Sequence, residues 1–230
     1  MAFQRARSEE QREARRRAIL DAAVAMLDEM PVSDISLNEL SRRAGLAKSN
    51  VLRYFESREA ILLELLDQRW KQWLADLDGQ LPPAPDAGDG AGTAGTAQER
   101  GDELAALLAG SLDSRQVLCD LLTAQSSVLE HNVSAEVAIR FKRASLDNIA
   151  TLAAMVRRPL PELGDDAALR VVVLCTAFVT AAWPATRPSP SVLAAYEADP
   201  TLAVLRIDFA AALREATATL ISGILARQPS

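Results

Sequence analysis

The chain has 230 residues, of which 49% are hydrophobic, and a formal net charge of −6. This length and hydrophobic content allow a sizeable core, divided between one small and one larger domain. The two cysteines, Cys119 and Cys175, lie far apart without a CxxC pairing, and this spacing favours reduced, packed thiols over a disulfide or a zinc site.

Export and membrane insertion are both disfavoured by the pattern of charge and hydropathy. The N-terminus is charged and lacks the apolar centre of a signal peptide, so we expect a cytoplasmic protein. The longest mostly apolar run, 169–183, is shorter than the roughly 18 to 20 residues that cross a bilayer, which indicates a buried helix and no membrane partner. The acidic excess lies beyond residue 60, with fourteen Lys and Arg against twenty-one Asp and Glu.

The first predicted element is a long amphipathic helix. Ala and Leu dominate the chain and recur at helical spacing, so the predicted fold class is all-α. Ser8 and Gln11 form a capping box, apolar residues follow at helical spacing up to Met30, and Pro31 ends the helix. We expect this helix to pack under the segment that follows.

The segment 36–55, SLNELSRRAGLAKSNVLRYF, predicts two short helices joined by a turn. Ser36 occupies an N-cap position with Glu39 three residues later, and Gly45 suits the left-handed residue that ends the first helix. This is the pattern of a helix-turn-helix. The outward residues of the second helix are basic or hydrogen-bonding, as in surfaces that contact phosphates and base edges in a major groove: Lys48, Ser49, Asn50 and Arg53.

Helical patterns continue to the C-terminus. A helix capped by Ser57 runs over 58–78, and the Pro- and Gly-rich segment 81–101 predicts a mobile loop. Further helices are expected at about 99–112, 114–130, 134–158, 165–183, after Pro190, and at about 203–227.

The residues at the end of the helix-turn-helix give the chain a family resemblance. Arg53, Tyr54 and Phe55 close the second helix, and ESREAIL (56–62) opens the next, an order that resembles the DNA-binding domain of the TetR family of transcriptional regulators. The resemblance implies an all-α protein with an N-terminal three-helix DNA-binding domain, 1–56, and a C-terminal effector-binding and dimerisation domain, 57–230. It also implies a homodimer that binds a palindromic operator on double-stranded DNA.

The same resemblance assigns roles to individual residues. Asn38, Lys48 and Ser49 resemble positions that approach bases, whereas Ser36, Asn50, Tyr54 and Arg58 resemble phosphate contacts, and Arg53 fits either role. Two positions depart from the family pattern: Leu52 replaces a common tyrosine and either packs or contacts a thymine methyl group, and Ala47 replaces the usual hydroxyl cap. The arginines of the first helix either reach flanking phosphates or form a solvated face.

The two last long helices are apolar over much of their circumference. By the resemblance they would pair with their twins in the dimer through Val171, Val172, Val179, Leu213, Leu220 and Ile224, although a core within one chain remains the alternative. Candidate walls and polar groups of an effector pocket are Trp70, Trp73, His131, Phe141, Asn148, Met155, Phe178 and Trp183, which would suit an apolar or aromatic effector.

The sequence therefore predicts a DNA-binding regulator, more specifically a repressor that a small effector releases from its operator. No metal or cofactor is expected, and no catalytic motif such as HExxH or a nucleophile elbow is present, so an enzyme is not expected. Two alternatives remain open: a helical protein that binds small molecules without binding an operator, and a helical protein-interaction adaptor.

Overall fold

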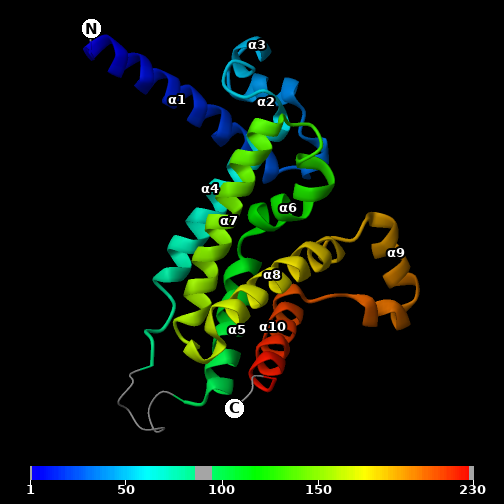
Figure 1. Ribbon diagram of the computed structural model, residues 1–230. Coiled ribbons are helices and arrows are strands. Elements are labelled where there is room, and N and C mark those ends of the chain that lie inside the picture. The colour runs from blue at the N-terminus through cyan, green and yellow to red at the C-terminus, as the bar shows by residue number, and fades with distance from the viewer. Residues whose placement is uncertain (1, 86–94, 228–230) are drawn as a thin grey trace. The chain divides into compact units, whose positions relative to one another are not determined.

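The computed structural model describes residues 2–85 and 95–227, and all regular secondary structure in these ranges is helical (Figure 1). The prediction of an all-α fold is confirmed. The helices are α1 (Ala2–Leu27), α2 (Leu37–Arg43), α3 (Lys48–Val51), α4 (Arg58–Asp78), α5 (Ala97–Asp113), α6 (Gln116–Ala124), α7 (Ala135–Arg157), α8 (Gly164–Ala182), α9 (Pro190–Ala198) and α10 (Phe209–Leu225). Most of the predicted loop 81–101 is described, but its residues 86–94 lie outside the described ranges.

The chain divides into two compact units. Unit 1 comprises Met1–Arg69 with Ala124–Arg143, and unit 2 comprises Trp70–Thr123 with Ala144–Ser230. The helices α4 and α7 each contribute residues to both units.

The core of unit 1 joins the first helix to the helix-turn-helix. Ile19, Ala23 and Met26 of α1 are fully buried, as are Ile35, just before α2, and Leu40 within α2. Because these side chains share one interior, α1 supplies the apolar support that two short helices cannot build alone. α1 begins at Ala2, so the predicted start at Ser8 is wrong: the alternating charged residues before Ser8 continue the helix.

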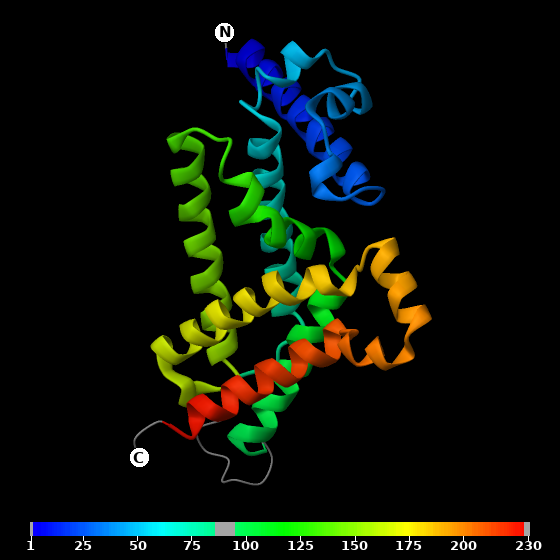
Figure 2. The ribbon, with the colours of Figure 1, turned by 90° about the vertical axis from the view of Figure 1, so that its right-hand side faces the viewer.

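In unit 2, α10 packs against both α5 and α8 (Figure 2, red against green and yellow). The contact with α5 is close at Gly101, where an added Cβ would lie 2.9 Å from Cγ2 of Ile221. α9 and the 3-10 turn η5 (Pro200–Leu205) form an excursion between α8 and α10. Gly101 therefore sets how closely α5 and α10 can approach each other.

The starts of two predicted helices shift because of side-chain caps, and a third helix changes form near its end. α5 begins at Ala97, inside the segment expected to be a loop, since the Thr96 side chain and Glu99 form a reciprocal capping box. The predicted helix 114–130 ends in a π-helical turn, η2 (Gln125–Leu129). α10 begins at Phe209 rather than near 203 because the Asp208 side chain accepts from the backbone N–H of Ala211.

The stretch Pro161–Thr186, which contains α8 and its flanking 3-10 turns, is longer than the apolar run that the sequence suggested. By length and composition alone it is the one helical stretch among the described residues that could cross a membrane, and 39% of its most apolar window is buried. The core helix of a soluble protein has the same composition. α8 combines buried residues with an exposed apolar side, which is described below.

Candidate functional site

The outer face of α3 is polar and open to solvent. Lys48, Ser49 and Asn50 are exposed, whereas Val51 on the opposite side is fully buried. Phe55 is also buried, so the apolar side of this segment faces the core of unit 1. Packing of Val51 and Phe55 therefore fixes which side chains point outward, as the apolar spacing predicted.

The second helix of the motif is shorter than predicted. α3 ends at Val51, and residues 52–54 continue as hydrogen-bonded turns, with the Tyr54 N–H 2.9 Å from the Val51 carbonyl oxygen. Arg53 remains exposed and Tyr54 is half-buried. Leu52 is 43% exposed, so it does not pack in the core, and its other expected role, a contact with a thymine methyl group, stays a prediction. The four-residue helix leaves this apolar side chain beside the polar face.

The caps of the motif differ in quality. The Ser36 hydroxyl accepts from the backbone N–H of Glu39 at 3.2 Å, which confirms the predicted N-cap of α2. Gly45 has φ +66° between the two helices, the left-handed conformation that its position predicted. Ala47 precedes α3 in extended conformation and gives it no side-chain hydrogen bond. The N-terminus of α3, the shortest helix of the motif, is therefore the one without a stabilising side-chain cap.

A charged cluster on α2 is satisfied internally. The Glu39 carboxylate accepts from Arg42 at 2.6 Å and from Arg43 at 3.0 Å, and Arg43 also pairs with Glu29 at 2.6 Å. Hydrogen bonds from Arg42 and then Arg43 lower the pKa of Glu39 to about 2, so Glu39 stays ionised. The carboxylate is turned to these arginines, and the Ser36 hydroxyl alone caps α2.

A polar cleft joins α1 to the end of the motif. It is lined by Gln11, Arg12 and Arg15 of α1 together with Arg53 and Tyr54. Three guanidinium groups around one opening create a positive potential that attracts a phosphate. The sequence left open whether the α1 arginines reach phosphates, and the structure places two of them beside two residues already expected to contact DNA.

Two other arginines of unit 1 are held by internal partners. Arg16 pairs with Glu64 and lies over the Phe55 ring, with its guanidinium carbon 4.6 Å from the ring centroid. Arg58, the expected phosphate contact, donates to Glu59 at 2.8 Å and to the backbone carbonyl oxygens of Ser33 and Ile35. Its guanidinium ties the start of α4 to the segment before α2. A phosphate contact by Arg58 stays a prediction.

Unit 2 contains a narrow apolar cavity of about 30 Å³. Its lining residues come from α4, α5, α6, α7, α8 and α10: Trp70, Trp73, Leu108, Leu112, Leu122, Leu152, Val156, Val171, Val172, Cys175, Thr176, Val179, Leu213 and Thr217. Of the eight residues proposed for a pocket from the sequence, Trp70 and Trp73 line it. The aliphatic lining was missed because core and cavity walls share one sequence pattern.

The other six candidates lie outside this lining. Trp183 packs edge-on against Phe209 with ring centroids 4.8 Å apart, and its indole donates to Asp120 at 2.7 Å, so it serves the core. His131 is exposed, and both it and the buried Phe141 belong to unit 1. The remaining three belong to unit 2 and are the buried Asn148 and the half-buried Met155 and Phe178.

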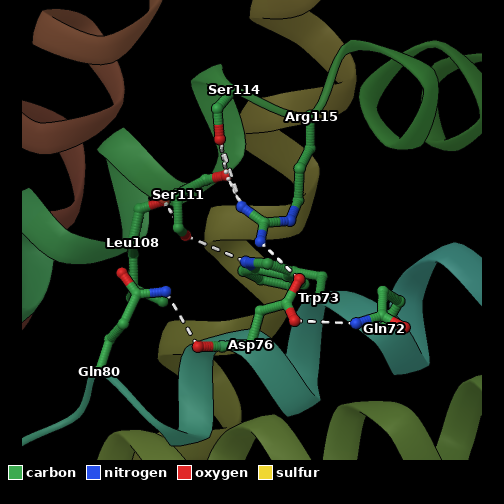
Figure 3. A network of polar contacts seen from close by, with 8 residues as sticks. All are labelled: Gln72, Trp73, Asp76, Gln80, Leu108, Ser111, Ser114 and Arg115. Atoms are coloured by element: carbon green, nitrogen blue, oxygen red, sulfur yellow. Dashed lines mark hydrogen bonds and ion pairs between the residues drawn. The ribbon is translucent and has the colours of Figure 1, made fainter.

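One cavity wall is held by a hydrogen-bond network between α4 and the α5–α6 corner (Figure 3). The Trp73 indole donates to the Ser111 hydroxyl at 3.0 Å, and that hydroxyl donates to the Leu108 carbonyl oxygen at 2.9 Å. Arg115 donates to Asp76 at 2.9 Å, which lowers the pKa of that carboxyl. These contacts fix the Trp73 ring, so this part of the cavity wall is already formed when no ligand is bound.

Most of the residues expected at a dimer interface are buried within the single chain. Val171, Val172, Val179 and Leu213 are at most 2% exposed and line the cavity, so they have almost no area left for a partner. Their assignment to the interface is corrected accordingly. Leu220 and Ile224 are half-buried, and the exposed apolar side chains of α8 are instead Leu169, Val173 and Leu174.

Two family matches cover the two parts of the chain. Residues 19–65 match the family described as bacterial regulatory proteins, tetR family, and residues 67–228 match the tetracyclin repressor-like C-terminal domain. The chain belongs to the TetR family. The helix-turn-helix and the C-terminal helices around the cavity thus fall in the two domains of this family of DNA-binding transcriptional regulators.

Curated relatives within the TetR family resemble mainly the N-terminal segment. The HTH-type transcriptional regulator EthR of Mycobacterium tuberculosis is 43% identical over 51 residues, which are 22% of this chain and 24% of EthR. RutR of Escherichia coli is 36% identical over 64 residues, which are 28% of this chain and 30% of RutR. The chain matches less than a third of the length of these relatives, so their activities are not transferred whole.

Solved structures agree with the TetR fold over nearly the whole chain. A TetR transcriptional regulator from Rhodococcus sp. RHA1 aligns with a TM-score of 0.55 at 18% identity, covering 96% of this chain and all of that one. The regulator FadR from Bacillus subtilis, solved with stearoyl-CoA, aligns with a TM-score of 0.53 at 15% identity, covering 90% and 97%. At such identities the likeness shows the fold alone.

Proposed function

We propose that this TetR-family protein is a cytoplasmic repressor whose dimer binds a palindromic operator and releases it when a small effector fills the cavity of unit 2. The observation that carries the DNA-binding role is the exposed polar face of α3 held over a buried Val51 and Phe55. A short helix with that division can enter a major groove while its support stays outside.

Base and phosphate contacts divide over this face. We assign base reading to Asn38, Lys48 and Ser49, and phosphate contacts to Ser36, Asn50 and Tyr54. The cleft formed by Arg12, Arg15 and Arg53 adds a second phosphate position, because three guanidinium groups there attract the DNA backbone without reading its sequence.

A hydrogen bond in unit 1 gives the effector a route to the DNA-binding face. Glu56 directly follows Phe55 in the sequence. The Ser134 backbone N–H donates to the Glu56 carboxylate at 2.6 Å, and this bond lowers the pKa of Glu56. Ser134 also caps α7, whose later residues Leu152 and Val156 line the cavity. A displacement of α7 by an effector would therefore reach the residue that follows the recognition segment, and useful coupling needs only about 1 to 3 kcal/mol.

The dimer would use the exposed apolar side of α8 together with α10. Leu169, Val173 and Leu174 are 42%, 48% and 50% exposed, and Leu220 and Ile224 of α10 keep part of their surface open. Closed two-fold association buries such a surface against its own copy. This replaces the set of interface residues suggested by the sequence.

Operator binding is tested on a duplex selected from random DNA by the purified protein. We expect a palindromic site and an affinity that falls steeply with salt, by a log–log slope of roughly −0.9 per phosphate contacted. The combined variant Lys48→Ala, Asn50→Ala, Tyr54→Ala should weaken binding by roughly a hundredfold or more, because each lost contact is worth about 1 to 3 kcal/mol. Arg140→Ala, which removes an exposed charge elsewhere in unit 1, is the control. Unchanged affinity of the triple variant would place the contact surface elsewhere.

The interface is tested by sedimentation of Val173→Glu, Leu174→Glu. Both side chains are about half exposed in the single chain, so the double variant should fold with unchanged helical content and sediment as a monomer. Val204→Glu, at a residue 85% exposed on η5, should remain dimeric. A dimer that survives both charges would contradict the assignment to α8.

A further inference from the structure

Arg58 differs from Arg53, the other arginine expected to contact DNA, in where its guanidinium is directed. Arg53 is exposed and borders the polar cleft, whereas the Arg58 side chain is 27% exposed. Nε of Arg58 donates to the Glu59 carboxylate at 2.8 Å. Its Nη1 donates to the backbone carbonyl oxygens of Ser33 and Ile35. The Arg58 guanidinium is therefore engaged with acceptors inside unit 1.

The two carbonyl oxygens belong to the segment that leads into α2. The 3-10 turn η1 (Val32–Asp34) ends just before Ile35, which directly precedes the N-cap of α2. Among the described residues, no backbone N–H donates to the carbonyl oxygen of Ser33 or Ile35. Carbonyl groups without a backbone partner depend on side chains or water, and the planar guanidinium of Arg58 supplies a donor to both. Arg58 therefore holds the chain where it enters α2.

The partner of Arg58 on its own helix is a buried carboxylate. Glu59 lies in the first turn of α4 and is 6% exposed. An ionised group at this depth needs a hydrogen-bonded countercharge, because burial removes its hydration. If the guanidinium turned outward to a phosphate, Glu59 would lose the countercharge that Arg58 supplies. The buried acid therefore keeps Arg58 directed inward.

Two residues assigned to DNA contacts stand directly after the segment that Arg58 holds. Ser36 is the N-cap of α2, and Asn38 follows in its first turn; both are exposed. The buried side chains of Ile35 and Leu40 fix the entry angle of α2 from its apolar side. The bonds from Arg58 fix it from the carbonyl side, so they set where Asn38 points.

We propose that Arg58 and Glu59 form a positioning pair that orients the start of α2 for base reading, and that the Arg58 guanidinium neutralises no phosphate. This inference rests on the proposed function, in which Asn38 reads bases and Ser36 contacts a phosphate. It departs from the phosphate contact that the family resemblance implies for Arg58. The pair acts on DNA only through α2.

The two roles make opposite predictions for salt dependence and sequence preference. Loss of a cation that contacts a phosphate weakens binding to every duplex and lowers the log–log salt slope by about 0.9. Loss of a positioning residue weakens binding to the operator alone, because non-specific binding needs no base contact. The ratio of the affinities for the operator and for a scrambled duplex of equal length therefore separates the two roles.

Arg58→Gln and Arg53→Gln form a matched pair for this test in the full-length protein. We expect Arg58→Gln to bind the operator roughly tenfold more weakly, the effect of one lost base contact, with an unchanged salt slope and unchanged affinity for the scrambled duplex. Arg53→Gln removes a guanidinium at the polar cleft. It should weaken binding to both duplexes alike and lower the slope by about 0.9.

Two further variants change the pair less drastically. Arg58→Lys keeps the positive charge but has no planar fork to span the carboxylate and the two carbonyl oxygens, so it should lose operator affinity as Arg58→Gln does. A phosphate contact would survive this change. Glu59→Gln should also weaken operator binding, because Arg58 loses its charged partner. A guanidinium that contacts a phosphate would instead be freed by this change and bind DNA more tightly.

A loss of global stability alone does not produce this pattern, since a smaller folded fraction weakens binding to both duplexes alike. Hydrogen exchange of the Glu39 backbone N–H, which donates to the Ser36 hydroxyl, reports on the start of α2 directly. It should become faster in the Arg58 and Glu59 variants and stay unchanged in Arg53→Gln. If Arg58→Gln does not fold, Arg58→Lys and Glu59→Gln decide.

Any of four results would overturn the proposal: a salt slope lowered equally by Arg58→Gln and Arg53→Gln, full operator affinity of Arg58→Lys, tighter binding by Glu59→Gln, or unchanged exchange at Glu39 in all variants. With a wild-type protein that prefers its operator, each refutes the positioning pair alone. A wild-type protein that binds the operator and the scrambled duplex equally refutes the proposed function instead.

Discussion

The DNA-binding face and the cavity wall are built in opposite ways. The face collects residues 36–54, a short continuous segment, and its side chains are polar and exposed around a buried Val51. The cavity collects residues from Trp70 to Thr217, which are apolar and come from six helices. A contiguous polar face can lose a side chain without loss of fold, whereas a wall assembled from distant helices is also the core of its unit.

The sharpest test of this difference is a truncation in the wall. Leu213→Ala removes a side chain that is 1% exposed and lines the cavity, so it should cost about 2 to 5 kcal/mol in the free energy of unfolding. Lys48→Ala on the exposed face should change it by no more than about 0.5 kcal/mol. Urea unfolding followed by circular dichroism measures both values.

Leu146→Ala is the matched control for the truncation, because Leu146 on α7 is 65% exposed and loses the same atoms. It should lie within about 0.5 kcal/mol of the wild-type protein. A Leu213→Ala variant as stable as Leu146→Ala would mean that the wall is not part of the packed core, and the contrast between the two regions would fail.

A smaller effect is expected from the helix caps of the DNA-binding face. Ala47→Ser should give α3 the side-chain cap that it lacks and stabilise unit 1 by about 1 kcal/mol. Ser36→Ala should remove the existing cap of α2 and destabilise it by about the same amount. Thermal unfolding of the two variants should therefore shift in opposite directions.

The caps also probe how independent the face is from the rest of the chain. Hydrogen exchange of the α3 backbone N–H groups should slow in Ala47→Ser without a change in unit 2, because the cap acts within one helical turn. Protection that rises in both units would show that the start of α3 is coupled to the cavity.

Much of the DNA-binding segment could be predicted because its signals are local. The Ser36 cap, the left-handed Gly45 and the buried Val51 and Phe55 follow from residues a few positions apart. The predicted length of α3 was wrong, because the helix gives way to turns after Val51. The internal bonds of Arg58 were equally hidden, because their acceptors lie 23 and 25 residues away.

The apolar helices show why the interface and the pocket were harder to predict. Apolar residues around a whole helix indicate burial, but they do not say whether the neighbour is the same chain, a second copy or a ligand. The sequence assigned Val171 and Val172 to a dimer, and the structure buries them beside the cavity. It also grouped Trp183 with Trp70, although the Trp183 indole donates to Asp120 and the Trp70 indole has no hydrogen-bond partner among the described residues.

The sequence by itself determined the all-α fold, the helix-turn-helix and the polar side chains of its outer face, because periodicity, caps and turn glycines act over a few residues. Only the tertiary structure decided which apolar side chains enclose a cavity, which arginines stay available and which indole lacks an acceptor. Those outcomes depend on contacts between helices far apart in the chain, and the spacing of residues along one helix does not show which other helices pack against it.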